Sequence, residues 1–263
     1  MEGNEFIKYY PLTIPRSKKY GNNYWTPRGN KVGKRTIELH SDLEFDHWLT
    51  VETNPKVKTY CEQPLQISYV LNGQLRTSVF DMWILYLDDS ETFVEVKYEK
   101  ELVSTHPKYD RTKRQIEAQQ EWCRKNYKAY EVRTEKFIRS GRHSIENRTS
   151  IATAVLNRSK PACYLDVLSY VSGNSKKIGN IVQELSRYPS DDVNLALKWL
   201  YYDGHLIGNI EDQIWGNEME EQVDPNLWPT VDENSLSEPA RTKYIQQIAW
   251  IISNTRQELH LAT

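Results

Sequence analysis

Two neighbouring segments have the hydrophobic pattern of paired β-strands. Residues 77–87 are rich in aromatic and β-branched side chains, and residues 92–98 alternate between polar and apolar positions. Residues 88–90, Asp-Asp-Ser, stand between them, and such residues are typical of a tight turn. The pattern therefore predicts a β-hairpin over this part of the chain.

Helical spacing precedes and follows this hairpin. After Ser41, apolar residues recur with the period of a helix, which makes Ser41 the expected N-cap and places Glu44 in the first turn. Residues 109–127 predict a basic, glutamine-rich amphipathic helix, and residues 130–134 return to a strand pattern. The order of elements predicts an α/β domain.

The C-terminal half has a different pattern. Short helices are predicted at residues 164–171, 176–186 and 191–202, followed by a strand at 205–210. This order is that of a winged helix-turn-helix, so we expect a mostly α-helical, winged-helix-like domain over residues 160–212. Its third helix begins with acids and has little positive charge, which favours protein contact over reading of the major groove.

Composition limits the class of protein. The 263 residues are long enough for one or two domains, and 27% of them are charged. No apolar run has the length that a membrane helix needs, and the N-terminus has no signal-peptide pattern, so we expect a cytoplasmic protein without a membrane partner. Cysteines are few and widely separated, which predicts neither a zinc site nor a disulfide framework.

The predicted hairpin brings together side chains suited to metal and phosphate chemistry. Asp81 on the first strand faces Glu95 on the second, and Lys97 shares the face of Glu95, because side chains alternate with a period of two. Mg²⁺, or Mn²⁺ in its place, prefers oxygen ligands and usually takes one or two protein carboxylates. We expect Asp81, Glu95 and the carbonyl of Val96 to bind the ion. Lys97 is expected to orient the attacking water or offset developing charge. A surface hairpin with a cross-strand Glu–Lys pair is the alternative.

Glu44 is a third acid with two interpretations. It is a candidate metal ligand and catalytic acid beside the hairpin. The motif Ser41-x-x-Glu44 is also a capping box, in which the glutamate only satisfies backbone amides at its own helix start. Spacing alone does not separate these roles.

The order of these motifs resembles a known nuclease fold. Ser-Asp-Leu-Glu at 41–44, the segment 57–65, the strand carrying Asp81, and Glu95-Val96-Lys97 before a helix resemble the PD-(D/E)XK nucleases. The fold expected from this likeness is a restriction-endonuclease-like core with a mixed sheet. Within that superfamily the chain is similar to TnsA, the endonuclease subunit of Tns-type heteromeric transposases, most specifically over residues 31–138.

The resemblance implies an activity and partners. TnsA cleaves the 5′ (non-transferred) strands at transposon ends, while a DDE recombinase subunit, TnsB-like here, cleaves and joins the 3′ ends. Glu44, Asp81 and Lys97 match the family's catalytic residues. Glu95 stands where the best-known member has Gln, and Phe80 precedes Asp81 without the usual proline. A TnsC-like AAA+ ATPase is the implied regulator, and the number of metal ions stays open.

Charge is distributed unevenly along the chain. Residues 1–36 form a basic, aromatic arm with eight Lys or Arg, and residues 211–240 contain many acids and no Lys or Arg. A cationic arm suits a phosphate backbone. The residues expected to bind DNA are Lys18, Lys19, Arg28, Lys31, Lys34 and Arg35 of the arm, with Lys113 and Arg114 of the helix at 109–127. A solvated extension and an ordinary exposed helix face are the alternatives.

The remaining prediction concerns the C-terminus. Residues 241–263 contain an apolar stripe at helical spacing that includes Tyr244, Ile248 and Ile252. These three residues are candidate contacts with the AAA+ regulator, and packing on the chain's own domain is the alternative.

The predicted organisation is an arm (1–36), a nuclease domain (37–150), a winged-helix-like domain (160–212), an acidic linker (213–240) and a last helix (241–263). The predicted function is Mg²⁺-dependent cleavage of DNA at transposon ends. A stand-alone nuclease of restriction or resolvase type, and a non-catalytic winged-helix regulator, are the alternatives.

Overall fold

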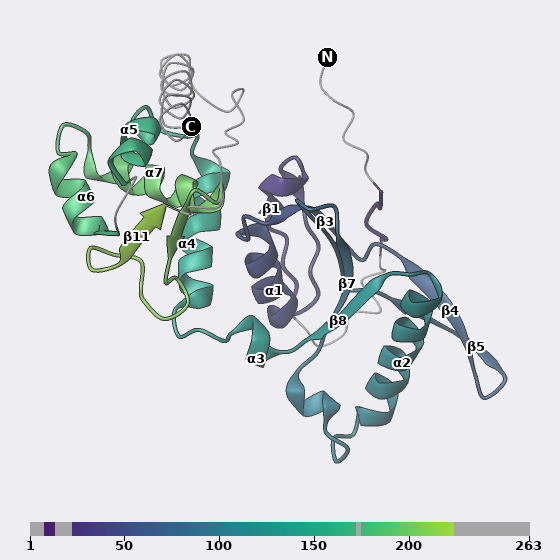
Figure 1. Ribbon diagram of the computed structural model, residues 1–263. Coiled ribbons are helices and arrows are strands. Elements are labelled where there is room, and N and C mark those ends of the chain that lie inside the picture. Colours follow the sequence, from purple (N-terminus) through teal and green to yellow (C-terminus); the bar gives the residue numbers. More distant parts are fainter. Residues whose placement is uncertain (1–7, 14–22, 172–174, 224–263) are drawn as a thin grey trace, which may run out of the picture. The chain divides into compact units, whose positions relative to one another are not determined.

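The computed structural model describes residues 8–13, 23–171 and 175–223 (Figure 1). The chain is of mixed α/β type and divides into two compact units, Met1–Arg148 and Thr149–Thr263. The division falls inside helix α4 (Ser144–Asn157), and each unit has its own cluster of buried apolar side chains. No helix in the described part of the chain combines the length and apolar character that a membrane crossing requires.

The N-terminal unit is built on a mixed four-stranded sheet with the order β3-β6-β7-β8. Its strands are β3 (Val57–Glu62), β6 (Met82–Tyr86), β7 (Glu91–Val96) and β8 (Ala129–Arg133). β3, β6 and β7 are antiparallel neighbours, whereas β8 runs parallel to β7. A parallel pair needs a crossover connection, which a 3-10 helix (Glu99–Leu102) and helix α2 (Tyr109–Lys125) provide.

Helices α1 (Asp42–Glu52) and α2 cover opposite faces of this sheet (Figure 1). The indole of Trp48 on α1 donates a hydrogen bond of 2.6 Å to the hydroxyl of Tyr60 on β3. The next residue, Cys61, packs in the aromatic cluster that includes Trp122 of α2. Because consecutive side chains of a strand point to opposite faces, α1 and α2 lie on opposite sides of β3.

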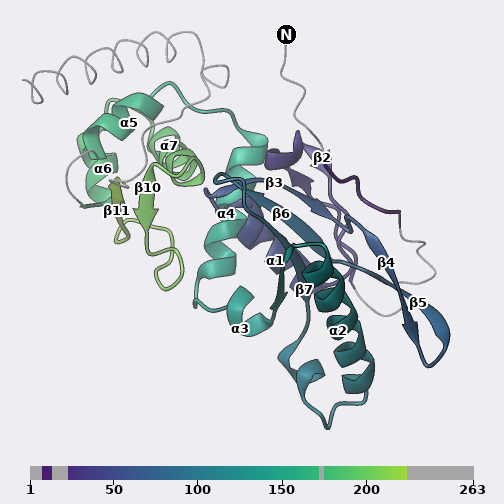
Figure 2. The same cartoon turned by 45° about the vertical axis from the view of Figure 1, so that its right-hand side comes forward.

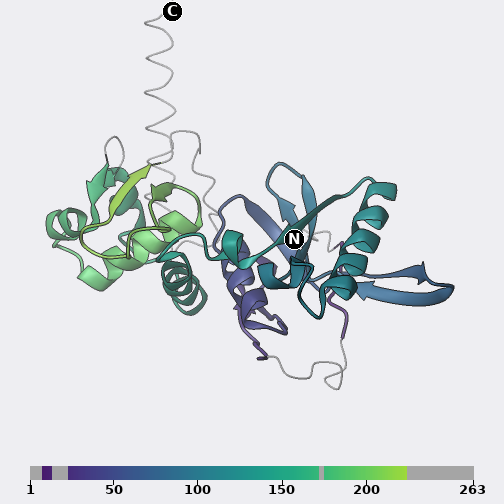
Figure 3. The same ribbon diagram turned by 90° about the horizontal axis from the view of Figure 1, so that it is seen from below.

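The predicted hairpin is confirmed in its second half and wrong in its first. β6 and β7 pair as an antiparallel hairpin. The single strand expected at 77–87 is instead divided between β5 (Gln74–Val79) and β6, and β5 pairs with β4 (Gln66–Leu71) in a separate two-stranded hairpin. The break occurs because Phe80 turns into the core, where it is fully buried against Phe93. Figures 2 and 3 show the β4–β5 hairpin projecting beyond the main sheet.

Part of the predicted basic arm is folded. β1 (Arg28–Gly29) and β2 (Arg35–Thr36) pair around a 3-10 helix (Asn30–Val32), so residues 28–36 belong to the N-terminal unit rather than to an extended arm. The guanidinium of Arg35 binds both carboxylate oxygens of the buried Glu62 at 2.6 Å. This bidentate pair fixes the hairpin to β3.

The helices on either side of the predicted hairpin are confirmed, and the connection to the second unit is not as expected. α1 begins after Ser41, whose hydroxyl accepts a hydrogen bond from the Glu44 amide at 3.1 Å, and α2 spans Tyr109–Lys125. The stretch after residue 138, where the sequence pattern predicted no helix, contains α4. That helix forms because Ile151, Ala152 and Val155 provide a buried apolar face. The short helix α3 (Glu135–Ile138) precedes it.

The C-terminal unit contains helices and a small antiparallel sheet of order β10-β11-β9. Its elements are α5 (Tyr164–Val171), β9 (Lys176–Lys177), α6 (Ile178–Glu184), α7 (Ser190–Tyr202), β10 (Leu206–Gly208) and β11 (Glu220–Val223). The helix expected at 176–186 is shorter, because its first two residues pair with β11. Residues 220–223, expected in the acidic linker, form β11 itself. The rest of that linker beyond residue 223 and the last helix lie outside the described residues.

We predict that Glu221 makes the stability of the C-terminal unit depend on pH. Its side chain is fully buried, and among the described residues neither carboxylate oxygen has a hydrogen-bond partner. Burial raises the pKa of Glu221 from 4.5 to about 8. The folded state therefore holds this proton more tightly than the unfolded state does. The stabilisation is complete below about pH 4.5 and is lost as the pH rises to about 8. The free energy of unfolding falls by several kcal/mol in total over this range.

Urea denaturation of the full chain across this pH range checks the prediction. Glu221→Met should remove the decline and raise the free energy of unfolding near pH 8. Glu220→Met is the matched control, because Glu220 is the neighbouring, exposed carboxylate of the same strand. A Glu221→Met profile parallel to that of the wild type would contradict the argument.

Candidate active site

The antiparallel register of β6 and β7 brings Asp81 and Glu95 together. Met82 pairs with Val94, so Asp81, the residue before β6, stands opposite Glu95. The backbone amide of Val96 donates a hydrogen bond of 2.7 Å to Oδ2 of Asp81, which fixes that carboxylate at the end of β7. Two sequence-predicted site residues therefore lie together on neighbouring strands.

Glu95 is fully buried and surrounded by donors. Its Oε1 accepts hydrogen bonds from Lys97 Nζ and, at 2.6 Å, from Gln115 Nε2. Its Oε2 accepts from Gln119 Nε2 at 2.8 Å. A buried carboxylate without such partners would be strongly unfavourable, and these donors are suited to its ionised form.

Gln119 is itself held in one orientation. The hydroxyl of Tyr130 on β8 donates to Gln119 Oε1 at 2.8 Å, so the amide nitrogen must face Glu95. The same nitrogen also lies 3.0 Å from Ser78 Oγ and 3.2 Å from the carbonyl of Val79. Gln119 thus joins α2, β5 and β8 to the carboxylate on β7.

Sequence reasoning missed Gln119 and Tyr130. The amphipathic pattern of the helix did not show which glutamines are buried: Gln120 is exposed, and the buried positions are Thr112, Gln119 and Cys123. The signal that was available is the spacing of Gln115 and Gln119, which lie four residues apart and hence on one face of a helix. Polar residues at that spacing on a core-facing stripe indicate a buried polar partner.

Glu44 has the capping role, and it also lies near the residues of the hairpin, while its role as a metal ligand or catalytic acid stays a prediction. Its carboxylate accepts hydrogen bonds from the His40 amide at 3.0 Å and the Ser41 hydroxyl at 3.1 Å, as a helix-capping glutamate does. Burial raises the pKa of Glu44, Lys97 lowers it and Glu95 raises it further, so this carboxylate also lies in the field of the hairpin residues.

The three acids and one lysine form a strongly coupled group. Burial raises the pKa of Asp81 to about 7; Lys97 opposes this rise and Glu44 adds to it. Burial likewise raises the pKa of Glu95 to about 7, with Asp81 adding to the rise. Burial alone would lower the pKa of Lys97, but Glu95 and Asp81 raise it above its ordinary value. The acids outnumber the single ammonium group, so the site favours a further cation.

The donor set fits a hard ion that keeps much of its water shell. Within the described residues, no group of three or more His, Cys, Asp or Glu side chains is arranged to hold a metal ion. Mg²⁺ needs only one or two carboxylates with additional oxygen ligands. Asp81, Glu95 and the Val96 carbonyl have oxygen atoms of this kind at neighbouring strand ends. Lys97 Nζ contacts both Glu95 Oε1 and, at 3.3 Å, the Val96 carbonyl, so an ion at those oxygens would replace the ammonium group there.

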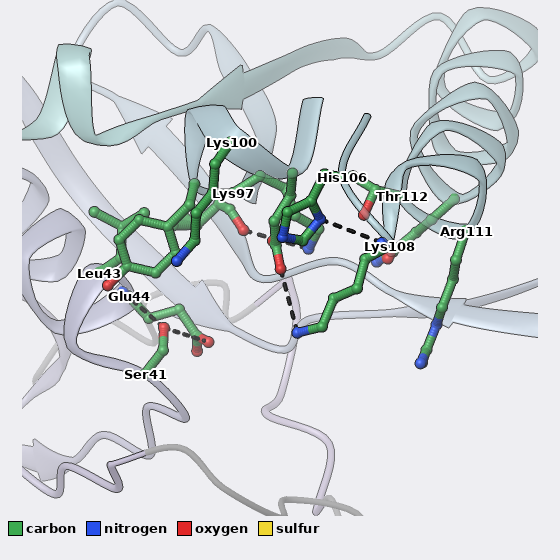
Figure 4. A pocket seen from close by; sticks show the side chains of 13 residues that line it. Ser41, Leu43, Glu44, Lys97, Lys100, His106, Lys108, Arg111 and Thr112 are labelled. Carbon is green, nitrogen blue, oxygen red and sulfur yellow. Dashed lines mark hydrogen bonds and ion pairs between the residues drawn. The ribbon is translucent and has the colours of Figure 1, made fainter. Parts of the chain in front are cut away.

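A cavity of about 440 Å³ opens beside these residues (Figure 4). Its wall is rich in cationic side chains from the end of β7, the 3-10 helix, the loop after it and the start of α2. The lining includes Glu44, Lys97, Lys100, Glu101, His106, Lys108, Arg111 and Gln115. Val96 and Glu44 line it, whereas Asp81 and Glu95 lie behind this wall, with Lys97 and Gln115 between Glu95 and the cavity.

The residues predicted to bind DNA do not line this cavity. Arg35 binds Glu62, Lys31 Nζ donates to the Val57 carbonyl at 2.8 Å, and Arg28 donates to the Lys34 carbonyl at 2.9 Å. On α2, Lys113 and Arg114 are exposed, and Lys113 lies 3.9 Å from Glu117. Lys18 and Lys19, and the predicted partner contacts Tyr244, Ile248 and Ile252, lie outside the described residues. DNA and partner binding by these residues stays a prediction.

Comparison with known proteins supports an endonuclease domain. Residues 54–135 match the family model described as the TnsA-like endonuclease N-terminal domain. The resemblance inferred from the sequence is thereby confirmed over this segment, which contains Asp81, Glu95 and Lys97. Glu44 precedes it, and the fold brings that acid to the others. No curated protein matches the chain.

We predict that Gln119→Met destabilises the N-terminal unit by about 2 kcal/mol. The substitution keeps the side-chain shape but removes the hydrogen bonds that Gln119 makes with Glu95 Oε2 and with the Tyr130 hydroxyl. Urea denaturation measures the change in the free energy of unfolding. Gln120→Met is the matched control on the exposed face of the same helix and should change it little.

A double-mutant cycle assigns the effect to Glu95. In a Glu95→Met background, Gln119→Met should cost clearly less, because the buried charge that needs the amide has been removed. Equal costs in both backgrounds would show that Gln119 stabilises the unit independently of Glu95.

Proposed function

We propose that this chain, which carries a TnsA-like endonuclease domain, is the Mg²⁺-dependent endonuclease subunit of a heteromeric transposase. Its substrate is DNA at transposon ends, and it hydrolyses the 5′ (non-transferred) strand. The observation that carries the proposal is the group formed by Asp81, Glu95 and Lys97, all within the matched segment, with Glu44 brought beside them by α1.

Each residue has a separate part in the proposed reaction. Asp81 and Glu95 would hold the ion together with the Val96 carbonyl, and the Val96 amide keeps Asp81 in place. When bound, Mg²⁺ polarises the scissile phosphate and lowers the pKa of a water molecule. Glu44, held by the His40 amide and the Ser41 hydroxyl, adds a third carboxylate at the cavity wall. Hydrolysis leaves a 5′-phosphate and a 3′-hydroxyl.

Lys97 is the residue that changes partner. Without the ion its ammonium group neutralises Glu95. With an ion bound to Glu95, Lys97, which lines the cavity, would have its charge available to offset the negative charge that develops on the phosphate, or to orient the attacking water. Its position beside both Glu95 and the Val96 carbonyl supports this role.

The fold supports a restriction-endonuclease-like core in the N-terminal unit. The mixed sheet, with the proposed ligands at neighbouring ends of β6 and β7 and α1 and α2 on its two faces, has the arrangement expected of PD-(D/E)XK nucleases. In the C-terminal unit, α5, α6 and α7 are followed by the β10–β11 pair, which supports a winged-helix-like module. The exposed Asp191 at the start of α7 supports a role of this module in protein docking rather than in reading DNA.

The proposed partners complete the transposition reaction. A TnsB-like DDE recombinase cleaves and joins the 3′ ends, and a TnsC-like AAA+ ATPase regulates the assembly. The domain matched by residues 54–135 supports a subunit of such a system over a stand-alone nuclease or a regulator without catalysis.

We predict that Mn²⁺ binds the wild-type protein and that Asp81→Asn and Glu95→Gln each weaken this binding more than about tenfold. Both substitutions remove a charged oxygen ligand without changing side-chain shape. The measurement is a Mn²⁺ titration, with and without a DNA duplex, on protein whose folding is checked by circular dichroism. Asp89→Asn, in the exposed turn of the same hairpin, is the control and should bind as the wild type does. A wild type that binds no metal even with DNA present would remove the basis of the proposed function.

We predict that Lys97→Met separates metal binding from catalysis. The variant should bind Mn²⁺ at least as well as the wild type, because the ammonium group no longer occupies Glu95 Oε1 and the Val96 carbonyl. In a reaction reconstituted with the recombinase, it should fail to cut the 5′ strand while 3′ cleavage continues. Wild-type 5′ cleavage by this variant would exclude a catalytic role for Lys97.

A further inference from the structure

The cavity beside the proposed metal ligands has cationic groups that are not all neutralised. Lys97 contacts Glu95, and Lys108 lies 3.3 Å from Glu101. Lys100 has its ammonium group 5.3 Å from the ring of Tyr98 and, like Arg111, forms no ion pair among the described residues. In Figure 4 no dashed line reaches the guanidinium of Arg111, which extends beside Lys108. The wall of the site therefore offers free positive charge to a bound molecule.

A second cavity adjoins the first through Arg111. It has a volume of about 220 Å³ and lies between the β4–β5 hairpin and the start of α2. Tyr69, Thr77, Ser78 and Val79 of the hairpin form one wall, and Arg111 and Gln115 of α2 form the other. Arg111 and Gln115 also line the first cavity, so the two hollows are neighbours that share these two side chains of α2.

The groups that line the second cavity are suited to an anion. It contains hydroxyl groups, an amide and one unpaired guanidinium, and it contains no carboxylate. A metal ion would find no charged oxygen there. A phosphate group would find a planar donor for two parallel hydrogen bonds and hydroxyl donors opposite it.

We infer that this second cavity binds the phosphodiester next to the scissile one on the strand that is cut, with Arg111 as its phosphate ligand. The inference rests on the proposed function, since it places the same DNA strand across both cavities. It moves the expected DNA contact on α2 from Lys113 and Arg114, which line neither cavity, to the residue that lines both.

The position of Gln115 explains why this contact matters for the reaction. Its amide nitrogen lies 2.6 Å from Glu95 Oε1, and its side chain also lines the second cavity. A strand held at Arg111 is therefore separated from a proposed metal ligand by one side chain. The β4–β5 hairpin encloses this strand from the other side, which gives the projecting hairpin in Figure 2 a role in holding substrate.

The test measures DNA binding without cleavage. Fluorescence anisotropy follows a labelled transposon-end duplex binding to full-length Asp81→Asn protein, alone and with Arg111→Gln or Arg124→Gln added. Arg124→Gln is the matched control, because it removes the same charge from an exposed position of the same helix that lines neither cavity. We expect Arg111→Gln to weaken binding about tenfold and to lower the slope of log affinity against log salt by about one, while Arg124→Gln changes neither.

Replacing single phosphates of the cut strand by uncharged analogues locates the phosphate that Arg111 contacts. Methylphosphonates placed singly along the cut strand should weaken binding at one position in the parent protein and have no added effect there in Arg111→Gln. Unchanged binding by Arg111→Gln, or equal losses in both arginine variants, would overturn the subsite while leaving the metal-binding and cleavage results of the proposed function intact. Competition by polyglutamate as strong as that by unlabelled duplex would show that the cavity takes acidic peptide instead. Absence of DNA binding by the parent protein, while the wild type binds Mn²⁺, would also overturn it.

Discussion

The candidate site depends on one buried negative charge. Glu95 has no exposed surface, and the donors that satisfy it come from β7 itself and from α2, with Tyr130 of β8 fixing the amide of Gln119. An unpaired carboxylate in this position would be too costly to keep ionised. The ionised state of Glu95 therefore depends on the packing of α2 against the sheet. The crossover that makes β7 and β8 parallel is also what carries the two glutamines to the carboxylate.

A second constraint is the change of direction at Phe80. This ring is drawn into the aromatic core, which ends β5, starts β6 and sets Asp81 opposite Glu95. The same break allows β4 and β5 to form the projecting hairpin, which is one wall of the second cavity. Burial of Phe80 therefore determines both this wall and the position of Asp81. In the family pattern a proline stands at this place, and here burial of a phenylalanine accompanies the turn.

Electrostatic balance links structure to the proposed chemistry. Lys97 offsets the acids in the absence of an ion and contacts the oxygens that an ion would use. Glu44 can be both a helix cap and a member of this group because the start of α1 lies at the same cavity. By contrast, the sequence predicts that Arg28, Lys31 and Arg35 bind DNA. In the fold, Arg28 and Lys31 each donate to a backbone carbonyl, and Arg35 binds the buried carboxylate of Glu62.

Local pattern was sufficient for what depends on neighbouring residues. The Ser41 cap, the span of α2, the β6–β7 hairpin and the proximity of Asp81 and Glu95 follow from periodicity and turn chemistry, which act over a few residues. The division of residues 77–87 between two hairpins, the apolar face of α4 and the pairing of β11 with β9 did not follow, because they depend on partners distant in sequence. Gln119, Tyr130 and Arg111 were likewise identified only in the fold. A glutamine, a tyrosine or an arginine is chemically ordinary until packing removes water from around it or leaves its charge unpaired, and only the tertiary structure decides that.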